Sequence, residues 1–362
     1  MKKIVLPISL LLPHLCFAST VTMYGVLDTS LEVSKAPGED TLVQMSPGFQ
    51  SGNRYGFRGE EEIGGGYKVF FQLEQGLKLD TGAEHKSGLA FSRQANLGVA
   101  GSFGEVSFGR LGALSSDCGS YSILPVSFIG TSYSAKANSY SALILTDRYN
   151  NMVVYKTPSF GGFTISAMYS NGTPADENKW STNNHYYGLG GVYHNKNLTL
   201  TGIIEYLDNK AQASANIKPK GTQLYTIGVG YDFGSVNLAG TYQFSNNALM
   251  VENYMDVGKF IGENSLRKGA RQNAFVLSAD VPLAGGRAGM QVNYANGKFL
   301  DSSAGNKDYS TISVGAAYTY PFSNRTNLYS YAGYGATKKA LKTDDANSIR
   351  GYSLAIGLRH KF

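Results

Sequence analysis

The feature that most constrains this chain is an alternation of apolar and polar residues with a period of two, repeated along most of its length. In residues 67–79, six of the seven odd positions are apolar, whereas only one of the six even positions is. Residues 236–244 and 351–362 show the same pattern. Because successive side chains of a β-strand point to opposite faces, the pattern predicts strands with one apolar and one polar face. No segment shows a helical stripe of comparable length, so we expect an all-β chain.

Sixteen segments of this kind can be counted along the sequence. The predicted strands are 21–35, 53–62, 67–79, 89–100, 105–110, 148–157, 163–170, 185–194, 198–208, 222–232, 236–245, 272–281, 287–297, 309–320, 325–338 and 350–362. The connections between them alternate in length. The seven short ones are turn-like and rich in Gly, Pro, Asn and Ser, as at 64–66, 101–104 and 233–235. The eight long ones are 36–52, 80–88, 111–147, 171–184, 209–221, 246–271, 298–308 and 339–349.

This sorting of connections predicts a closed barrel rather than an open sheet. An even number of antiparallel strands, short turns at one end, long loops at the other and an apolar outer face are typical of a transmembrane β-barrel. Lipid tolerates such a barrel because closure pairs every backbone N–H and C=O group. With seven turns and eight loops, both termini are expected on the side of the short turns. A secreted β-sandwich would also alternate, but its connections would not fall into two length classes.

The composition supports this class. Charged residues make up 16% and aromatic residues 12% of the chain, and the mean hydropathy is −0.19. The aromatic content argues against disorder, and the hydropathy argues against a bundle of transmembrane helices. Aromatic residues at the strand ends beside the short turns resemble the girdle of a membrane barrel. They are Tyr155, Phe160, Phe163, Tyr193, Phe233, Tyr320 and Phe322.

The first 18 residues are expected to be a signal peptide for export. Lys2 and Lys3 precede an apolar centre, and Cys16-Phe17-Ala18 has the small-x-small form of a cleavage site. The mature chain, 19–362, is then a single barrel domain with a formal net charge lowered from +6 to +4. Cleavage leaves Cys118 as its single cysteine, so neither a disulfide framework nor a metal-binding or redox cysteine pair is expected. No cofactor is expected.

The sequence resembles the general porins of Gram-negative outer membranes, of the neisserial and beta-proteobacterial type, over essentially the whole mature chain. The resemblance is carried by residues 21–28 (VTMYGVLD), 54–61 (RYGFRGEE), 91–95 (FSRQA), 106–110 (VSFGR), 148–158 (RYNNMVVYKTP) and 357–362 (GLRHKF). It implies a homotrimer of sixteen-stranded barrels, each with its own water-filled pore. It also implies that the third outer loop, 111–147, folds inward and narrows the pore. A final strand ending in Phe362 is similar to the signal that barrel-assembly machinery reads.

The resemblance further implies that basic residues of the wall face an acid on the inward loop. Carried over to this chain, the basic cluster is Arg54, Arg93 and Arg148, and the loop acid is Asp117. Strict alternation places Arg93 with Leu97 and Val99, so its lumen position requires a change of phase. Further lumen charges are expected from the alternation of their strands. These are Arg58, Arg110, Lys68, Lys78, Glu74 and Lys156.

These charges predict a general diffusion channel for small hydrophilic solutes and ions, with a weak preference for anions. A substrate-specific channel is the nearest alternative, because Tyr121, Tyr133 and Tyr140 of the inward loop offer a path of aromatic residues for sugars. An adhesin or receptor acting through the exposed loops is a second alternative. No nucleophile, zinc-protease, dinucleotide or P-loop motif is present, so we expect no enzyme. Lys and Arg are not clustered, so nucleic acid is not an expected partner, whereas the pI of about 9.0 favours contact with lipopolysaccharide.

Overall fold

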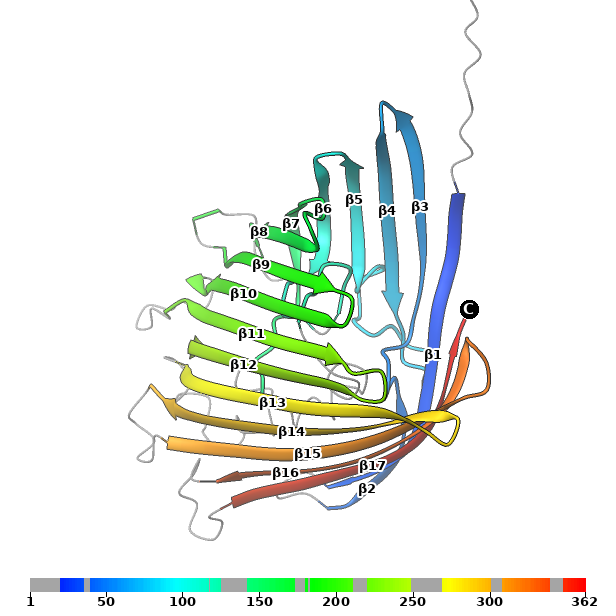
Figure 1. The fold of residues 1–362 in the computed structure, drawn as a ribbon, viewed down its shortest axis with the longest axis vertical. Helices are drawn as coiled ribbons and strands as arrows, with labels where there is room; N and C mark the ends of the chain where they lie inside the picture. The colour runs from blue at the N-terminus through cyan, green and yellow to red at the C-terminus, as the bar shows by residue number, and fades with distance from the viewer. Residues whose placement is uncertain are drawn as a thin grey trace, which may run out of the picture.

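The computed structural model describes residues 20–35, 40–116, 118–124, 142–172, 180–181, 183–210, 220–248, 269–300, 308–338 and 348–362. All its regular elements are strands (Figure 1). They are β1 (Thr20–Lys35), β2 (Leu42–Pro47), β3 (Arg54–Gly64), β4 (Tyr67–Gly76), β5 (Gln94–Gly101), β6 (Gly104–Gly112), β7 (Arg148–Lys156), β8 (Phe163–Ser170), β9 (His185–Asn195), β10 (Leu198–Asp208), β11 (Thr222–Asp232), β12 (Asn237–Ala248), β13 (Ala270–Leu283), β14 (Gly286–Phe299), β15 (Asp308–Pro321), β16 (Thr326–Lys338) and β17 (Ser348–Lys361). Among the described residues, no helix is long and apolar enough to cross a membrane.

The strands form one closed antiparallel sheet. From β3 to β17 each strand pairs with the next along the chain, and β1 pairs with β17 from Val26↔Lys361 to Lys35↔Tyr352. The last residue extends this seam, because Gly25 and Phe362 exchange backbone hydrogen bonds of 3.0 and 3.1 Å. Figure 1 shows the C-terminus beside β1. The predicted barrel is therefore confirmed, and the start of β1 and the C-terminus lie on the side of the short turns.

The barrel has sixteen wall positions although seventeen strands are counted, because β2 and β3 share one position. Both pair with β1, β2 with its outer half (Thr29↔Pro47 to Ser34↔Leu42) and β3 with its inner half (Thr20↔Glu60 to Val26↔Arg54). In Figure 1 they lie at opposite ends of β1. The prediction of 36–52 as a single outer loop is therefore wrong, since 42–47 continues the wall. The apolar Val43 and Met45 face outward beside Leu31 and Val33, as a strand requires.

The alternation of the sequence separates the two faces of the wall as predicted. Large apolar side chains are exposed on the outer face, for example Ile227 at 61% and Leu277 at 66%. Polar side chains of the intervening positions, such as Gln243 and Asn293, are buried inside. An outer surface of this kind is stable only in an apolar medium such as lipid. Aromatic rings gather beside the short turns, with centroid distances of 4.4 Å for Phe163–Tyr193 and 4.5 Å for Tyr231–Phe233.

The loop after β6 folds into the barrel, as predicted for 111–147, although residues 111 and 112 still belong to β6. The described residues of this loop are 113–116, 118–124 and 142–147. Gln272 of β13 donates a hydrogen bond to the carbonyl of Ala142 (2.8 Å), and Gln243 of β12 accepts one from the backbone of Ile144 (2.7 Å). Leu114 and Leu143 belong to a buried apolar cluster that includes residues of β7–β10, β13 and β14. The loop therefore crosses the lumen and is fixed to the far wall.

Candidate functional site

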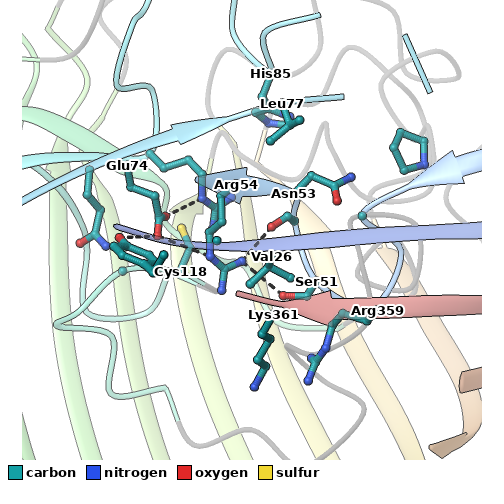
Figure 2. Close-up of a pocket in the computed structure, with 18 of the residues that line it drawn as sticks. Val26, Ser51, Asn53, Arg54, Glu74, Leu77, His85, Cys118, Arg359 and Lys361 are labelled. Atoms are coloured by element: carbon teal, nitrogen blue, oxygen red, sulfur yellow. Dashed lines mark hydrogen bonds and ion pairs between the residues drawn. The ribbon is translucent and has the colours of Figure 1, made fainter. Parts of the chain in front are cut away.

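A cavity of about 1130 Å³ lies inside the barrel, between the wall and the inward loop (Figure 2). One side is formed by β1, β3, β4 and β17, and the other by loop residues including Cys118, Ser120 and Leu124. Its lining is strongly basic among the described residues, with seven basic and two acidic side chains. The basic residues are Arg54, Arg58, Lys78, Arg93, Arg148, Arg359 and Lys361, and the acidic ones are Glu74 and Asp80.

Glu74 holds two of these arginines together. Its carboxylate lies 2.6 Å from Nε of Arg93 and 3.4 Å from Nε of Arg54. The same carboxylate accepts a hydrogen bond of 3.0 Å from the hydroxyl of Tyr24. Only 6% of the Glu74 side chain is exposed, so these partners compensate a carboxylate that would otherwise be buried without them. Figure 2 shows Arg54 and Glu74 pointing toward one another.

Closure of the barrel adds two charges from the end of the chain. Val26 of β1 pairs with Arg54 on one side and with Lys361 on the other, so these two basic residues flank the same position of β1. Because side chains in register share a face, both project into the lumen. Arg359 lies two residues before Lys361 on the same face of β17 (Figure 2). Two residues distant in sequence thereby join the cluster of Arg54 and Arg93.

Arg93 reaches the cavity because it lies outside the regular strand. β5 begins at Gln94, not at residue 89 as predicted, so the alternation of Leu97 and Val99 does not extend back to Arg93. The backbone N–H of Arg93 donates to the carbonyl of Glu74 (3.0 Å). Its guanidinium then turns inward to the carboxylate of the same residue. The change of phase that the lumen position of Arg93 requires is therefore explained by the end of the regular strand, because Arg93 precedes β5.

Arg148, at the start of β7, lines the same cavity next to Asp147. Asp147 also forms an ion pair of 3.2 Å with Lys86, which lies in the loop between β4 and β5. Desolvation would raise the pKa of Asp147, but the charges of Lys86 and Arg148 outweigh it, and the pKa is lowered. Nearby, burial and then the charges of Arg93 and Arg148 lower the pKa of the His85 imidazole. Around neutral pH this corner therefore has a charged carboxylate and an uncharged imidazole.

The other predicted lumen charges divide into three groups. Arg58, Lys78 and Glu74 line the cavity, and the guanidinium of Arg58 lies 5.4 Å from the centre of the Tyr24 ring. Lys68 and Lys156 are not among its lining residues; they pair with Glu60 (2.8 Å) and Glu105 (3.7 Å). Arg110 does not border the cavity either. Its buried guanidinium donates to the carbonyl of Ser92 and to Asn150, and the register of β6 with β7 shifts between Gly109 and Leu111, on either side of Arg110.

Asp117, the predicted loop acid, lies outside the described residues. Sequence reasoning did not name Arg359, Lys361 and His85, which line the cavity. Arg359 and Lys361 belong to the polar face of the alternating segment 351–362, so their strand was predicted. Their position near Arg54 was not. Within the described part of the chain, no group of three or more His, Cys, Asp or Glu side chains could hold a metal ion.

A closed barrel with an apolar outside, a polar bore and an inward loop defines a membrane channel of the β-barrel class. A family model for Gram-negative porins matches residues 15–340 of this chain. The chain therefore belongs to the Gram-negative porin family. It is 30% identical to an outer membrane porin protein of Bordetella pertussis over 95% of this chain and 94% of that protein. It is 26% identical to the major outer membrane protein P.IB of Neisseria meningitidis serogroup B, over the full length of both.

Solved structures show the same fold. The anion-selective porin from Comamonas acidovorans superposes with a TM-score of 0.68 at 24% identity, over 95% of this chain and all of that one. OmpT of Vibrio cholerae, in its trimer form, gives a TM-score of 0.65 at 16% identity over 95% of this chain and all of that one. This protein is thus an outer-membrane porin that crosses the membrane with its strands. Its bore is a route for passive diffusion of small hydrophilic solutes.

Proposed function

We propose that this porin is a homotrimer of separately conducting barrels that passes small hydrophilic solutes and ions with a weak preference for anions. The observation that supports the preference is the excess of seven basic over two acidic side chains around one cavity. A solved porin of the same fold is described as anion-selective, and another as a trimer. Both agree with the proposal.

The expected preference is weak because the positive charge is partly compensated. Glu74 neutralises one charge of the Arg54–Arg93 pair, and Asp147 lies beside Arg148. The remaining charges raise the concentration of anions in the bore and lower that of cations. We assign the constriction to Arg54, Arg93 and Arg148 on the wall, with Asp117 as the acid of the inward loop. Arg58, Lys78, Arg359 and Lys361 extend the basic surface.

Reversal potentials in planar bilayers test this proposal. Under a KCl gradient the purified porin should show a chloride permeability moderately above that of potassium. Because charges are screened within about 10 Å at 0.1 M salt and about 3 Å at 1 M, the preference should shrink at high salt. A clear cation preference at low salt would contradict the proposal. Liposome swelling with sugars of increasing size then separates a general channel from a specific one.

The remaining assignments follow from the fold and the sequence. We assign residues 1–18 to a signal peptide, because Lys2 and Lys3 precede an apolar centre and a small-x-small cleavage site. Phe362 completes the seam between β1 and β17, a suitable place for a signal to the barrel-assembly machinery. The outer face contacts lipid and lipopolysaccharide. We assign no catalysis and no nucleic-acid partner. Tyr121 is buried in the inward loop and is not among the residues that line the cavity, whereas Tyr133 and Tyr140 lie outside the described residues, so a substrate-specific channel stays the alternative.

A further inference from the structure

The break between β2 and β3 is longer than the wall requires. β2 ends at Pro47, opposite Thr29, and β3 begins at Arg54, opposite Val26. An unbroken strand would need two residues there, opposite Leu27 and Asp28. The chain instead has six, Gly48–Asn53, which we call the lumen wedge. Its turn begins at Gly48, whose φ of 71° favours glycine.

The lumen wedge leaves the wall on the inner side. Its Phe49 is fully buried and packs on inward-facing Tyr329 and Tyr331 of β16, at centroid distances of 6.3 and 5.4 Å. Ala317 and Ala355 complete this small apolar cluster. Gln50 accepts a hydrogen bond of 2.9 Å from Asn327, also on β16. The lumen wedge is therefore attached to a strand three positions away around the barrel, not only to its own neighbours.

Asp28 of β1 fixes the base of the lumen wedge. Asp28 pairs with Arg359 of β17, but the break leaves it without a ladder partner on the side of β2 and β3, and buried backbone polar groups require partners. Its N–H instead donates to the side chain of Asn53 (2.5 Å), and its carbonyl accepts from Gly48 (2.8 Å). Its buried carboxylate accepts hydrogen bonds from the backbone of Ser51 (2.7 Å) and the hydroxyl of Tyr329 (2.6 Å). Each of these polar groups of Asp28 therefore binds either the lumen wedge or Tyr329, on which Phe49 of the lumen wedge packs.

The free surface of the lumen wedge touches the basic cluster. Arg54 donates to the carbonyl of Gly52 (2.8 Å) and to the hydroxyl of Ser51 (3.3 Å). A Cβ added at Gly52 would lie 2.9 Å from Nη1 of Arg93. The lumen wedge therefore contacts both arginines that Glu74 joins. The inward loop lines the same cavity from the other side, through residues such as Ser120 and Ser122.

We propose that the lumen wedge is a second constriction element, opposed to the inward loop, and that it positions Arg54 and Arg93. Phe49 anchors it, and Ser51 and Gly52 are the positioning contacts. Its removal should widen the bore and release the two guanidinium groups. The effect on selectivity rests on the proposed anion preference, whereas the effect on bore width does not.

Phe49→Ala tests the anchor, and Phe49→Leu, which keeps an apolar side chain, should largely restore it. Phe108→Ala, on the lipid-facing side of β6, is the matched control for loss of a phenyl ring. We expect Phe49→Ala to raise single-channel conductance and to reduce the chloride preference roughly twofold or more in 0.1 M KCl, since displaced charges act on ions at greater distance. Phe108→Ala should leave both unchanged. An assembled Phe49→Ala trimer with the conductance and reversal potential of the unmodified porin would overturn the proposal.

Ser51→Cys provides a second test that leaves the anchor intact. In a Cys118→Ser background, a sulfonate-bearing thiol reagent applied to the folded trimer should lower the conductance and the chloride preference. The Cys118→Ser parent should not respond. If the thiol reacts without changing the current, the lumen wedge does not lie on the conducting path and the proposal is wrong. The sign of the reversal potential of the Cys118→Ser parent tests the proposed anion preference separately. The expected changes in conductance do not depend on that sign.

Discussion

Lys361→Gln removes one positive charge from the bore with little structural disturbance. Lys361 lines the cavity beside Arg54 across β1, and it forms no ion pair with another residue in the described part of the chain. Its backbone position is held by β1 and by a hydrogen bond to the carbonyl of Arg325 (2.8 Å). Glutamine keeps the polarity and most of the length of the side chain. The change in selectivity should therefore report the charge alone.

The magnitude follows from Coulomb's law with salt screening. A unit charge about 5 Å from a passing ion in water contributes ~0.8 kcal/mol, which screening reduces to ~0.5 kcal/mol at 0.1 M salt and below ~0.2 kcal/mol at 1 M. The loss of ~0.5 kcal/mol lowers the local anion concentration roughly twofold and raises that of cations by the same factor. The chloride-to-potassium permeability ratio should then fall about fivefold at 0.1 M KCl and less than twofold at 1 M.

The measurement is the reversal potential of single channels at both salt concentrations. Lys361→Arg keeps the charge and is the control for any effect of the substitution itself. Lys156→Gln removes a charge that is paired with Glu105 and does not line the cavity, so its shift should be much smaller. The reasoning fails if Lys361→Gln and Lys361→Arg give the same reversal potential at 0.1 M. It fails equally if the shift from Lys361→Gln does not shrink at 1 M.

Three further predictions concern the inward loop and its surroundings. Glu205→Ala should raise the conductance, because the buried Glu205 accepts hydrogen bonds from Ser115, Thr146 and Tyr186 that together fix the loop, at about 1 kcal/mol each; an unchanged single-channel conductance would show that the loop is held elsewhere. A sulfonate-bearing thiol reagent should react with Cys118, which lines the cavity, and reduce the chloride preference, whereas a trimethylammonium reagent should increase it and Cys118→Ser should respond to neither. The pKa of His85 is lowered, so the stability gained from its neutral form is present above its ordinary value of 6.5 and is lost as the pH falls below it. Between pH 6.5 and 5, the heat resistance of the trimer should therefore fall more in the unmodified porin than in His85→Gln, and equal slopes would contradict this assignment.

The wall of the barrel was predictable because each strand satisfies two requirements locally. A lipid-facing strand must be apolar at every second position, and the residues between must suit water, so the alternation of 67–79 or 351–362 is visible without knowledge of any partner. Turn residues such as Gly64, Gly65 and Gly66 mark where strands end, and all three have positive φ values. Strand order then follows, since neighbours in sequence pair in space. The sixteen wall positions and the side of the termini were therefore accessible from the sequence.

The irregular parts of the wall were not predictable in the same way. The lumen wedge has the composition of an outer loop, with Gly48, Gln50, Ser51, Gly52 and Asn53, and its single apolar residue, Phe49, breaks no pattern. Nothing in this stretch indicates that β2 rejoins the wall before it. Its fold is fixed by β16, more than 270 residues away, through hydrogen bonds and ring contacts that leave no periodic signal. The face of Arg93 was ambiguous for the related reason that a strand end changes the phase of alternation. The register shift next to Arg110 changes the phase in the same way, and the sequence did not indicate it.

Closure explains why the basic cluster can be dense in a porin. Arg54 and Lys361 face the lumen from two strands that both neighbour β1, and Arg93 approaches from a strand end. In a water-free protein core, charges of the same sign at these positions would be desolvated, and their repulsion would oppose folding. Here the bore keeps them near water and Glu74 compensates part of the charge, so the cost is reduced while the field at the bore persists. In the proposed function, the selectivity of the channel is therefore set by residues that lie far apart in the sequence, such as Arg54 and Lys361, and that only the closed sheet brings together.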